Sequence, residues 1–365
     1  MKISEIINYL DSYAPQSFKE DYDNVGLLVG NRNNEISGVL ISLDVTEAVV
    51  EEAVSKKANL IVSHHPIIFR GLKKLTGSNE VERVVSMAIK NDIALYAAHT
   101  NLDNIQGGVN TKIADKLGLE NQKFILPYAD NLNKLVTFVP ESHIEKVRTA
   151  IFDAGAGHIG NYDQTAYYTD GKGSFRALEG ANPYLGEVGK LNFEDEIRFE
   201  TIFPQHIQSK VITALLNAHP YEEVAYDIYP LKNKYPKAGT GIIGKLPEAI
   251  SEKDLLNLIK NTFNAEVIRH TAFKNKKIKK LAVCGGSCSF IINSAISAGA
   301  DALLTADVKY HEFFDVENRL FLMDIGHYES EQYTKEIFYD ILTKKFSNFA
   351  VNLSEINTNP IKYFK

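Results

Sequence analysis

The chain has 365 residues, of which 44% are hydrophobic and 24% charged, and its formal net charge is −6. This length and composition are typical of a folded protein with two or three domains, and they exclude a disordered chain or a small disulfide-stapled scaffold. The negative net charge argues against broad contact with the phosphate backbone of nucleic acid, so we do not expect nucleic acid as a partner.

The N-terminal residues 1–13 predict a short amphipathic helix that lacks the uninterrupted apolar core of a signal peptide. No segment approaches the roughly 20 apolar residues that a membrane-spanning helix needs. The two cysteines, Cys284 and Cys288, have a spacing that is typical neither of a disulfide framework nor of a Cys-x-x-Cys zinc site. The sequence therefore predicts a soluble protein in a reducing cytoplasm.

In residues 1–133, short apolar runs alternate with helical patterns. The apolar runs cover 38–43, 60–62 and 93–98, and the helical patterns cover 46–57 and 80–90. Near-continuous apolar strands that are separated by helices indicate a parallel sheet covered on both faces. We therefore expect a first α/β lobe here.

Residues 134–231 have a different character. An apolar strand pattern that ends at Pro140 precedes a helix at 143–154, and a Tyr- and Thr-rich extended stretch follows. A strand at 196–203, a helix to about 218 and a strand at 224–229 complete the order βαββαβ. This order predicts an inserted ferredoxin-like domain.

Residues 232–365 repeat the α/β pattern, with expected strands at 281–283, 302–305 and 320–323. We interpret the two lobes as an internal duplication that forms one discontinuous domain, with 232–245 as the returning link. The Gly-x-Gly-x-x-Gly pattern that begins at Gly239 lies within this link region. We reject it as a dinucleotide-binding fingerprint, because no strand enters it and no helix opens after it.

Polar side chains follow six of the expected strands. Ligand sites in open α/β sheets lie beyond the carboxyl ends of strands, so these side chains are the candidate site. In chain order they are Asp44; His64 and His65; His99 and Asp103; Gly285, Gly286 and Ser287; Asp307 and His311; and His327 and Glu331.

Two adjacent histidines favour a site with two metal ions. His64 and His65 are neighbours in an extended segment, so their side chains point apart and each could serve one of two adjacent ions. His327 and Glu331 are four residues apart and can lie on one face of a helix. Imidazole nitrogen with carboxylate oxygen and no thiolate suits Zn, Mn, Fe or Co, and leaves coordination positions open for catalysis.

Structural interpretations compete at several of these positions. A single buried histidine more often bonds to a carbonyl than to a metal. Taken singly, seven histidines fit that interpretation better: His99, His143, His158, His206, His219, His270 and His311. Asp44 could support a metal ligand without binding the metal itself. A role as the cap of the helix that follows it is at least as good an explanation. Gly285 and Gly286 could hold phosphate with their N–H groups, but a tight turn between strand and helix is favoured.

The motifs resemble the signature blocks of the Nif-three-like family, also called GTP cyclohydrolase I type 2 homologues. The matching blocks are Asp23-Asn-Val-Gly-Leu27, Ser-His64-His65-Pro, His99-Thr-Asn-Leu-Asp103, Cys-Gly-Gly-Ser, Thr-Ala-Asp307-Val-Lys-Tyr-His311 and Gly-His327-Tyr-Glu-Ser-Glu331. They span nearly the whole chain.

The resemblance implies two α/β lobes with a dinuclear metal site between them, in a toroidal homohexamer. Carried onto this sequence, the metal ligands of the family are His64, His65, Asp103, His327 and Glu331, with Glu331 bridging two divalent ions, of which zinc is the first choice. The segment 134–231 is similar to the PII- and CutA-like insertion of longer bacterial members, which suggests that it helps to cap the ring.

The expected function is that of a metal-dependent hydrolase, with GTP or another nucleotide as substrate. His99 is the candidate proton carrier, because it lies four residues before Asp103 and aligns with His327 in the second lobe. The alternative is a non-catalytic ring that delivers or senses metal ions or acts as a scaffold for partners. A hydrolase predicts that loss of His99 abolishes turnover while the metal stays bound.

Overall fold

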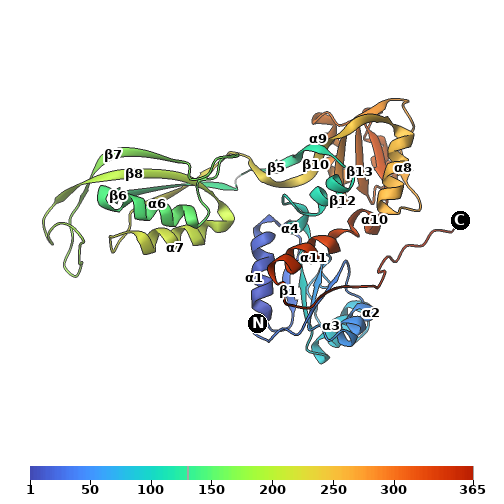
Figure 1. The fold of residues 1–365 in the computed structure, drawn as a ribbon, viewed down its shortest axis with the longest axis horizontal. Helices are drawn as coiled ribbons and strands as arrows, with labels where there is room; N and C mark the ends of the chain where they lie inside the picture. Colours follow the sequence, from blue (N-terminus) through green and yellow to red (C-terminus); the bar gives the residue numbers. More distant parts are fainter. Residues whose placement is uncertain (130, 365) are drawn as a thin grey trace. The chain divides into compact units, whose positions relative to one another are not determined.

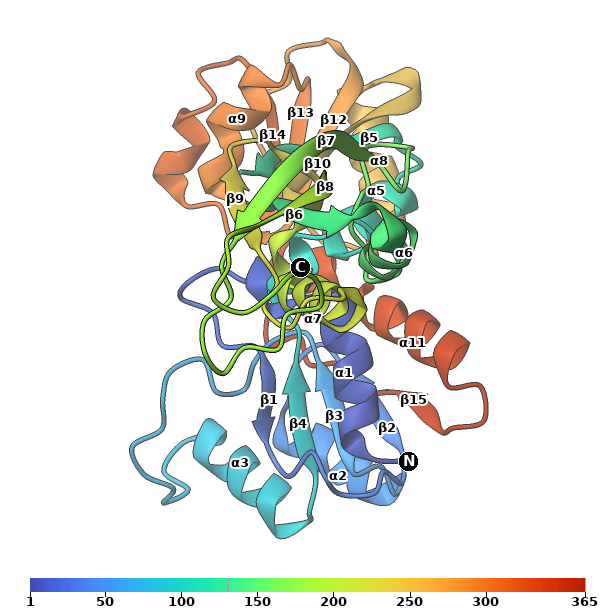
Figure 2. The same cartoon turned by 90° about the vertical axis from the view of Figure 1, so that its left-hand side faces the viewer.

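The computed structural model describes residues 1–129 and 131–364, and it divides into two compact units. The first unit combines 1–127 with 236–365, and the second consists of 128–235. Three sheets and their helices make up the described chain, so the expected mixed α/β class is confirmed. Figures 1 and 2 show the elements in two perpendicular views.

A five-stranded sheet in the order β1-β4-β3-β2-β15 organises the N-terminal part of the first unit. Its strands are β1 (Gly26–Val29), β2 (Val39–Ser42), β3 (Leu60–Ser63), β4 (Ala94–Ala97) and β15 (Val351–Leu353). Strands β2, β3, β4 and β15 are parallel, as the apolar runs predict, but β1 pairs antiparallel with β4. The sheet is therefore mixed rather than wholly parallel.

Helices cover both faces of this sheet. Side chains alternate between the two faces along each strand, and the buried strands are largely apolar, so both faces carry apolar side chains that helices must bury. Leu40, Ile61 and Leu95 pack with helices α2 (Glu47–Ser55) and α3 (Glu80–Lys90) in one buried cluster. On the other face, Tyr96 donates to Asp11 of α1 (Ile3–Tyr13) at 2.9 Å. Helix α11 (Thr334–Lys345) also contacts β2 and β15.

The second sheet of this unit has the order β11-β14-β13-β12-β10-β5. Its strands are β5 (Glu120–Tyr128), β10 (Tyr235–Ser251), β11 (Arg269–His270), β12 (Lys277–Ser287), β13 (Ala302–Ala306) and β14 (Phe321–Asp324). Strands β12, β13 and β14 are parallel and in the same order as β2, β3 and β4. The carboxyl ends of both strand triplets supply the candidate site.

Five further helices belong to the first unit. They are α4 (Thr100–Asp103), α5 (Val109–Lys116), α8 (Glu252–Phe263), α9 (Ile292–Ser297) and α10 (His327–Glu331), with 3₁₀ turns η1 (Gln16–Phe18), η4 (Ser289–Ile291) and η5 (Tyr310–Phe314) elsewhere in the unit. The expected link at 232–245 is mostly strand β10, which pairs antiparallel with β12. The Gly-x-Gly-x-x-Gly pattern lies inside β10, so the expectation that no strand enters it is wrong. The strand continues to Ser251 before α8 begins, so these glycines do not form a turn that opens a helix.

The second unit contains one antiparallel sheet in the order β7-β8-β6-β9. Its elements are β6 (Leu132–Pro140), η2 (Glu141–His143), α6 (Ile144–Asp153), β7 (Ala166–Phe175), β8 (Asn192–Pro204), η3 (Gln205–Ile207), α7 (Gln208–Ala218) and β9 (Tyr226–Leu231). Helices α6 and α7 lie side by side on one face of the sheet, where Phe199 and Phe203 belong to the buried core. The opposite face carries no helix of this unit.

One expectation about the cysteines is wrong. The structure joins Cys284 at the end of β12 to Cys288 in a disulfide that spans four residues. A separation of four residues closes a short local loop, which the spacing of common disulfide frameworks does not include. Both cysteines are buried in the core of the second sheet.

Among the described residues, no helix combines the length and apolarity that a membrane span requires.

Candidate metal centre

Three chain segments bring the candidate ligands together within the first unit. His64 and His65 directly follow β3, and Asp103 is the last residue of α4, which follows β4. His327 and Glu331 are the first and last residues of α10, which follows β14. The segments that follow the carboxyl ends of strands from both sheets thus supply the cluster, which is where ligand sites of open α/β sheets are expected.

The carboxylate of Glu331 lies at the middle of this cluster. Its Oε2 atom is 2.9 Å from Nε2 of His65 and 3.0 Å from Nε2 of His327. The same oxygen is 3.8 Å from Nε2 of His64. Glu331 therefore belongs to two groups of ligand atoms, one with His65 and His327 and the other with His64 and Asp103.

The spacing of these atoms suits a small divalent cation. Zn²⁺ binds nitrogen and oxygen at about 2.0–2.2 Å in tetrahedral geometry, which places neighbouring ligand atoms about 3.3–3.6 Å apart. Nε2 of His65 is 3.3 Å from Nε2 of His327, and Nε2 of His64 is 3.6 Å from Oδ1 of Asp103. Within each group all ligand atoms lie within 4.8 Å of one another.

Two of these atoms are buried without a hydrogen-bond partner among the residues that the structure describes. They are Nε2 of His64 and Oδ1 of Asp103. A buried polar atom without a partner costs about 1–3 kcal/mol, so native proteins rarely leave two of them face to face. A cation bound between them would satisfy both atoms, and this observation supports a metal site more directly than the distances do.

The far nitrogen of each histidine ring is held by a hydrogen-bond acceptor. Nδ1 of His65 donates to Asp44 at 2.7 Å, and Nδ1 of His327 donates to Asp307 at 2.6 Å. Nδ1 of His64 donates to the carbonyl of Ala98 at 2.9 Å. Acceptors on Nδ1 fix the tautomer and the ring orientation, so that Nε2 faces the cluster, as in most histidines that bind metals.

His99 is held in the same way by a residue from the N-terminal motif. Its Nδ1 donates to Oδ1 of Asp23 at 2.9 Å, while Oδ2 of Asp23 accepts from the backbone N–H of Thr100. The ring of His99 lies 5.2 Å from that of His64 and 5.4 Å from that of His65, measured between centroids. His99 also forms a third group of candidate ligand atoms with His64 and His65, although it is not one of the five expected ligands.

Burial and charge act in opposite directions on these groups. Burial lowers the pKa of His65, but hydrogen bonds to Asp44 and Glu331 outweigh it and raise the pKa to about 9. Burial also lowers the pKa of His327, but the charge of Glu331 and the bond to Asp307 raise it to about 11. Without a cation, two protonated imidazoles therefore balance the carboxylates.

The two carboxylates of the cluster have opposite shifts. Burial raises the pKa of Asp103, and the neighbouring charge of Glu331 raises it further. Burial would also raise the pKa of Glu331, but the charge of His327 and the imidazoles that face its carboxylate hold it well below its usual range. Strongly shifted acids and bases in one cluster are typical of functional sites.

Gly286 provides the space for the central carboxylate. Its φ of +63° is in the left-handed region, and a Cβ atom at this position would collide with Oε1 of Glu331. Gly285 and Gly286 lie within β12 and not in the tight turn that the sequence analysis favoured. The N–H of Gly286 donates to the hydroxyl of Ser330 in α10 at 3.0 Å, and the N–H of Gly285 donates to Oδ1 of Asn110 in α5 at 2.8 Å. Both N–H groups are therefore used within the protein and not for a phosphate.

Replacing Gly286 by alanine is expected to displace Glu331 and to reduce metal retention by at least tenfold, measured by metal titration of the purified protein. Gly118→Ala is the matched control, since Gly118 has a φ of +65° and open space around it. Both variants strain the backbone, at a cost of about 1–2 kcal/mol, but only Gly286→Ala reaches Glu331. Equal metal affinity in the two variants would refute this role for Gly286.

The remaining strand-end residues divide into two groups. Asp44 and Asp307 orient ligand histidines, and Asp44 is not the helix cap, because Thr46 accepts from the N–H of Val49 at the start of α2. His311 lies in η5 against the ring of Tyr310 and outside every group of candidate ligands in the described chain. Sequence reasoning missed the role of Asp23, although the motif that contains it was part of the family resemblance.

Comparison with known proteins identifies the family. The model of the Duf34/NIF3 family (NGG1p interacting factor 3) matches residues 1–360. The chain belongs to the Duf34/NIF3 family. The resemblance that the sequence motifs indicated is thereby confirmed.

Relatives in this family match over their full length. A Bacillus subtilis (strain 168) protein named "GTP cyclohydrolase 1 type 2 homolog" is 39% identical over 365 residues, which cover 98% of each chain. The crystal structure of a Bacillus cereus protein related to NIF3 has a TM-score of 0.89 and 39% identity, over 100% of this chain and 99% of the other. A Staphylococcus aureus structure covers the same shares with a TM-score of 0.78 and 30% identity. The Duf34/NIF3 fold therefore extends over the whole chain.

Proposed function

We propose that this protein holds two divalent metal ions and uses them as a hydrolase. His65 and His327 would hold one ion, His64 and Asp103 would hold the other, and Glu331 would be shared by both. The observation that carries the proposal is the buried, unpartnered pair of atoms on His64 and Asp103, beside a carboxylate that two further imidazoles contact. Zinc is our first choice, and Mn, Fe or Co also suit nitrogen and oxygen ligands.

Such ions supply Lewis acidity and lower the pKa of water when they are bound. The side chains of the protein would hold and move the protons. Asp23 accepts from Nδ1 of His99, so Nε2 of His99 is free to take a proton from water and pass it to a leaving group. Asp23 also stabilises the protonated ring, which is consistent with its pKa of about 2: burial would raise it, but the hydrogen bond and charge of His99 lower it.

We propose a nucleotide as the substrate class, with opening of the GTP ring as the first reaction to examine. The support is the name of the relatives, GTP cyclohydrolase 1 type 2 homolog. We also propose a cytoplasmic homohexamer, in which 134–231 is an inserted PII- or CutA-like ferredoxin-like domain between lobes 1–133 and 232–365. The family resemblance supports this assembly, and the strand order of the second unit suits a ferredoxin-like insert.

The test is a hydrolysis assay on the full chain, purified without a histidine tag. GTP and a panel of other nucleotides are incubated with protein loaded with Zn²⁺, Mn²⁺, Fe²⁺ or Co²⁺, and products are separated by chromatography. We expect turnover that a chelator abolishes and that added metal restores. Absence of turnover with every metal, combined with rapid transfer of the metal to an apo-enzyme, would overturn the hydrolase in favour of metal delivery.

A further inference from the structure

A cavity lined only by residues of the unit 128–235 has a volume of about 770 Å³. Its floor is the sheet face opposite α6 and α7. Because side chains alternate along strands, Gly171 of β7, Glu196 and Arg198 of β8 and Phe138 of β6 share this face, and the strand register places them next to one another. The volume is within the range of small-molecule sites, about 300–1,000 Å³.

Glycines make the floor of this cavity hollow. A Cβ atom on Gly171 would have only the carbonyl oxygen of Glu196 near it, at 3.7 Å, so the space above this glycine is open. A Cβ atom on Gly173 would collide with the carboxylate of Glu196, which lies across that glycine. The hydroxyl of Tyr221 donates to this carboxylate at 2.8 Å and closes one side of the floor.

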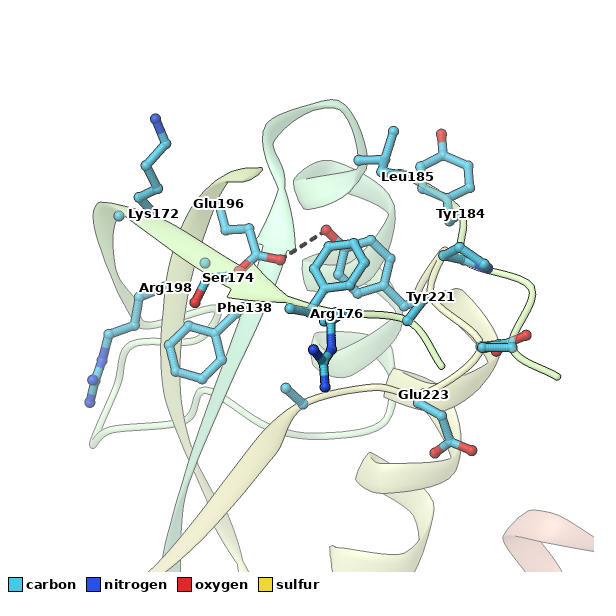
Figure 3. Close-up of a pocket in the computed structure, with 18 of the residues that line it drawn as sticks. Phe138, Lys172, Ser174, Arg176, Tyr184, Leu185, Glu196, Arg198, Tyr221 and Glu223 are labelled. Atoms are coloured by element: carbon cyan, nitrogen blue, oxygen red, sulfur yellow. Dashed lines mark hydrogen bonds between the residues drawn. The ribbon is translucent and has the colours of Figure 1, made fainter. Parts of the chain in front are cut away.

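Aromatic side chains line the walls. The loop after β7 contributes Tyr184, whose ring centroid is 6.3 Å from that of Tyr221. Phe138 and Phe175 also line the cavity, and Figure 3 shows the ring of Phe138 from the floor. Four aromatic rings around one cavity favour a ligand with a planar aromatic group, because offset or edge-to-face ring pairs add about 0.5–1.5 kcal/mol each.

Most charges around the cavity are already paired. Lys172 and Arg198 point away from the cavity in Figure 3. Lys172 forms an ion pair with Asp195 at 3.5 Å, and Arg198 forms one with Glu200 at 2.8 Å. Glu222, at the edge of the cavity, accepts from the backbone N–H of Asn182 at 3.0 Å. These groups therefore need no ligand to balance them.

Three charged side chains of the lining, those of Asp170, Arg176 and Glu223, form no ion pair or side-chain hydrogen bond within the described residues. Of these three, Arg176 and Glu223 have opposite charges. Figure 3 shows Arg176 and Glu223 among the residues that line the cavity, and both side chains are exposed. Neither side chain has an ion pair or a hydrogen bond with any residue in 1–129 or 131–364. A guanidinium can hold a carboxylate with two parallel hydrogen bonds, and a carboxylate can accept from an ammonium group.

We propose that this cavity binds an aromatic amino acid as a free zwitterion. Arg176 binds its carboxylate, Glu223 binds its ammonium group, and the side chain lies over Gly171 between the aromatic walls. The site is independent of the metal centre in its residues and its chemistry. It makes the unit 128–235 a ligand-binding module, a role that no motif in the sequence indicated.

The first experiment is calorimetric titration of the full chain with four probes that share an indole ring. Tryptophan carries both charges, tryptamine only the ammonium, indole-3-propionate only the carboxylate, and indole neither. We expect tryptophan to bind at least tenfold more tightly than each probe that lacks one or both charges. No binding of tryptophan, or equal affinity for all four probes, would overturn the proposal.

Variants then locate the site. Gly171→Val fills the floor, and the backbone of β7 accommodates a β-branched residue there, so we expect loss of tryptophan binding. Tyr167→Val is the matched control, because Tyr167 is on the same strand and sheet face but outside the cavity, and its affinity should stay within twofold of the original chain. Tryptophan binding that survives Gly171→Val unchanged would overturn the site.

Two exposed charges allow a test that does not disturb the fold. Arg176→Met keeps an unbranched, flexible side chain but removes the guanidinium and its charge, and Glu223→Gln keeps the shape of the carboxylate. We expect each to weaken tryptophan binding at least fivefold. Arg176→Met should leave the affinity for tryptamine unchanged, and Glu223→Gln should leave the affinity for indole-3-propionate unchanged. Unaltered tryptophan affinity in both variants would contradict the proposal.

Discussion

Replacing Glu331 by glutamine is expected to weaken metal binding more than 100-fold. Oε2 of Glu331 lies within 3.0 Å of Nε2 of two histidines and 3.8 Å from a third, so a single change removes the negative charge from both groups of ligands. Loss of an outer partner of a ligand histidine already costs about 10–100-fold in affinity, and Glu331 contacts the ligand atoms themselves. Metal titration and elemental analysis of the purified variant measure the effect.

Glu329→Gln is the matched control for this change. Glu329 lies on the same short helix and is also buried, but it accepts from Asn359 at 3.0 Å and belongs to no group of candidate ligands in the described residues. We expect this variant to retain its metal. If Glu331→Gln retained two ions with the affinity of the original chain, our assignment of the site would be wrong.

Replacing His99 by asparagine is expected to lower turnover by 10²–10⁴-fold, which is the usual contribution of a general acid or base. The metal should stay bound, because the five expected ligands do not include His99. Hydrolysis rates and metal content are measured on the same preparation. A hydrolase that loses proton transfer but keeps its ions shows this combination, whereas a metal-delivery protein would show no change in its transfer rate.

His311→Asn controls for the loss of an imidazole elsewhere in the same unit, since His311 lies outside the cluster. Asp23→Asn tests the partner of His99 separately. This change keeps the shape of the side chain but removes the carboxylate that accepts from Nδ1 of His99 at 2.9 Å. We expect it to lower turnover less than His99→Asn. Metal loss in His99→Asn, or unchanged turnover, would contradict the role proposed for His99.

The sequence predicts the positions of the central strands and the residues at which they end, because these strands are buried on both faces. Strands β3 and β13 are buried on both faces, so each reads as a continuous apolar run that ends abruptly at a polar residue. The expected helix at 80–90 has the same bounds as α3, where Asn79 caps the N-terminus. Since the carboxyl ends of parallel strands meet at one edge, the polar residues that follow them predict the metal cluster.

The outer strands and the supporting contacts could not be predicted in the same way. Strand β1 is half-buried and only four residues long, and much of β10 resembles a polar link in the sequence. The contact between Asp23 and His99 spans 76 residues, and Gly286 meets Glu331 across two elements. No local pattern encodes such distant pairs. The same applies to Arg176 and Glu223, which approach one cavity from separate loops.

The most direct test of the dinuclear centre is the metal content of the chain, purified without added metal and without a histidine tag. Elemental analysis should give about two divalent ions per chain for the original protein and a marked loss for Glu331→Gln. Two ions would agree with two groups of ligands that share one carboxylate. A chain that neither retains nor takes up divalent ions on titration would contradict the account, because His64 and Asp103 would then face each other without a cation.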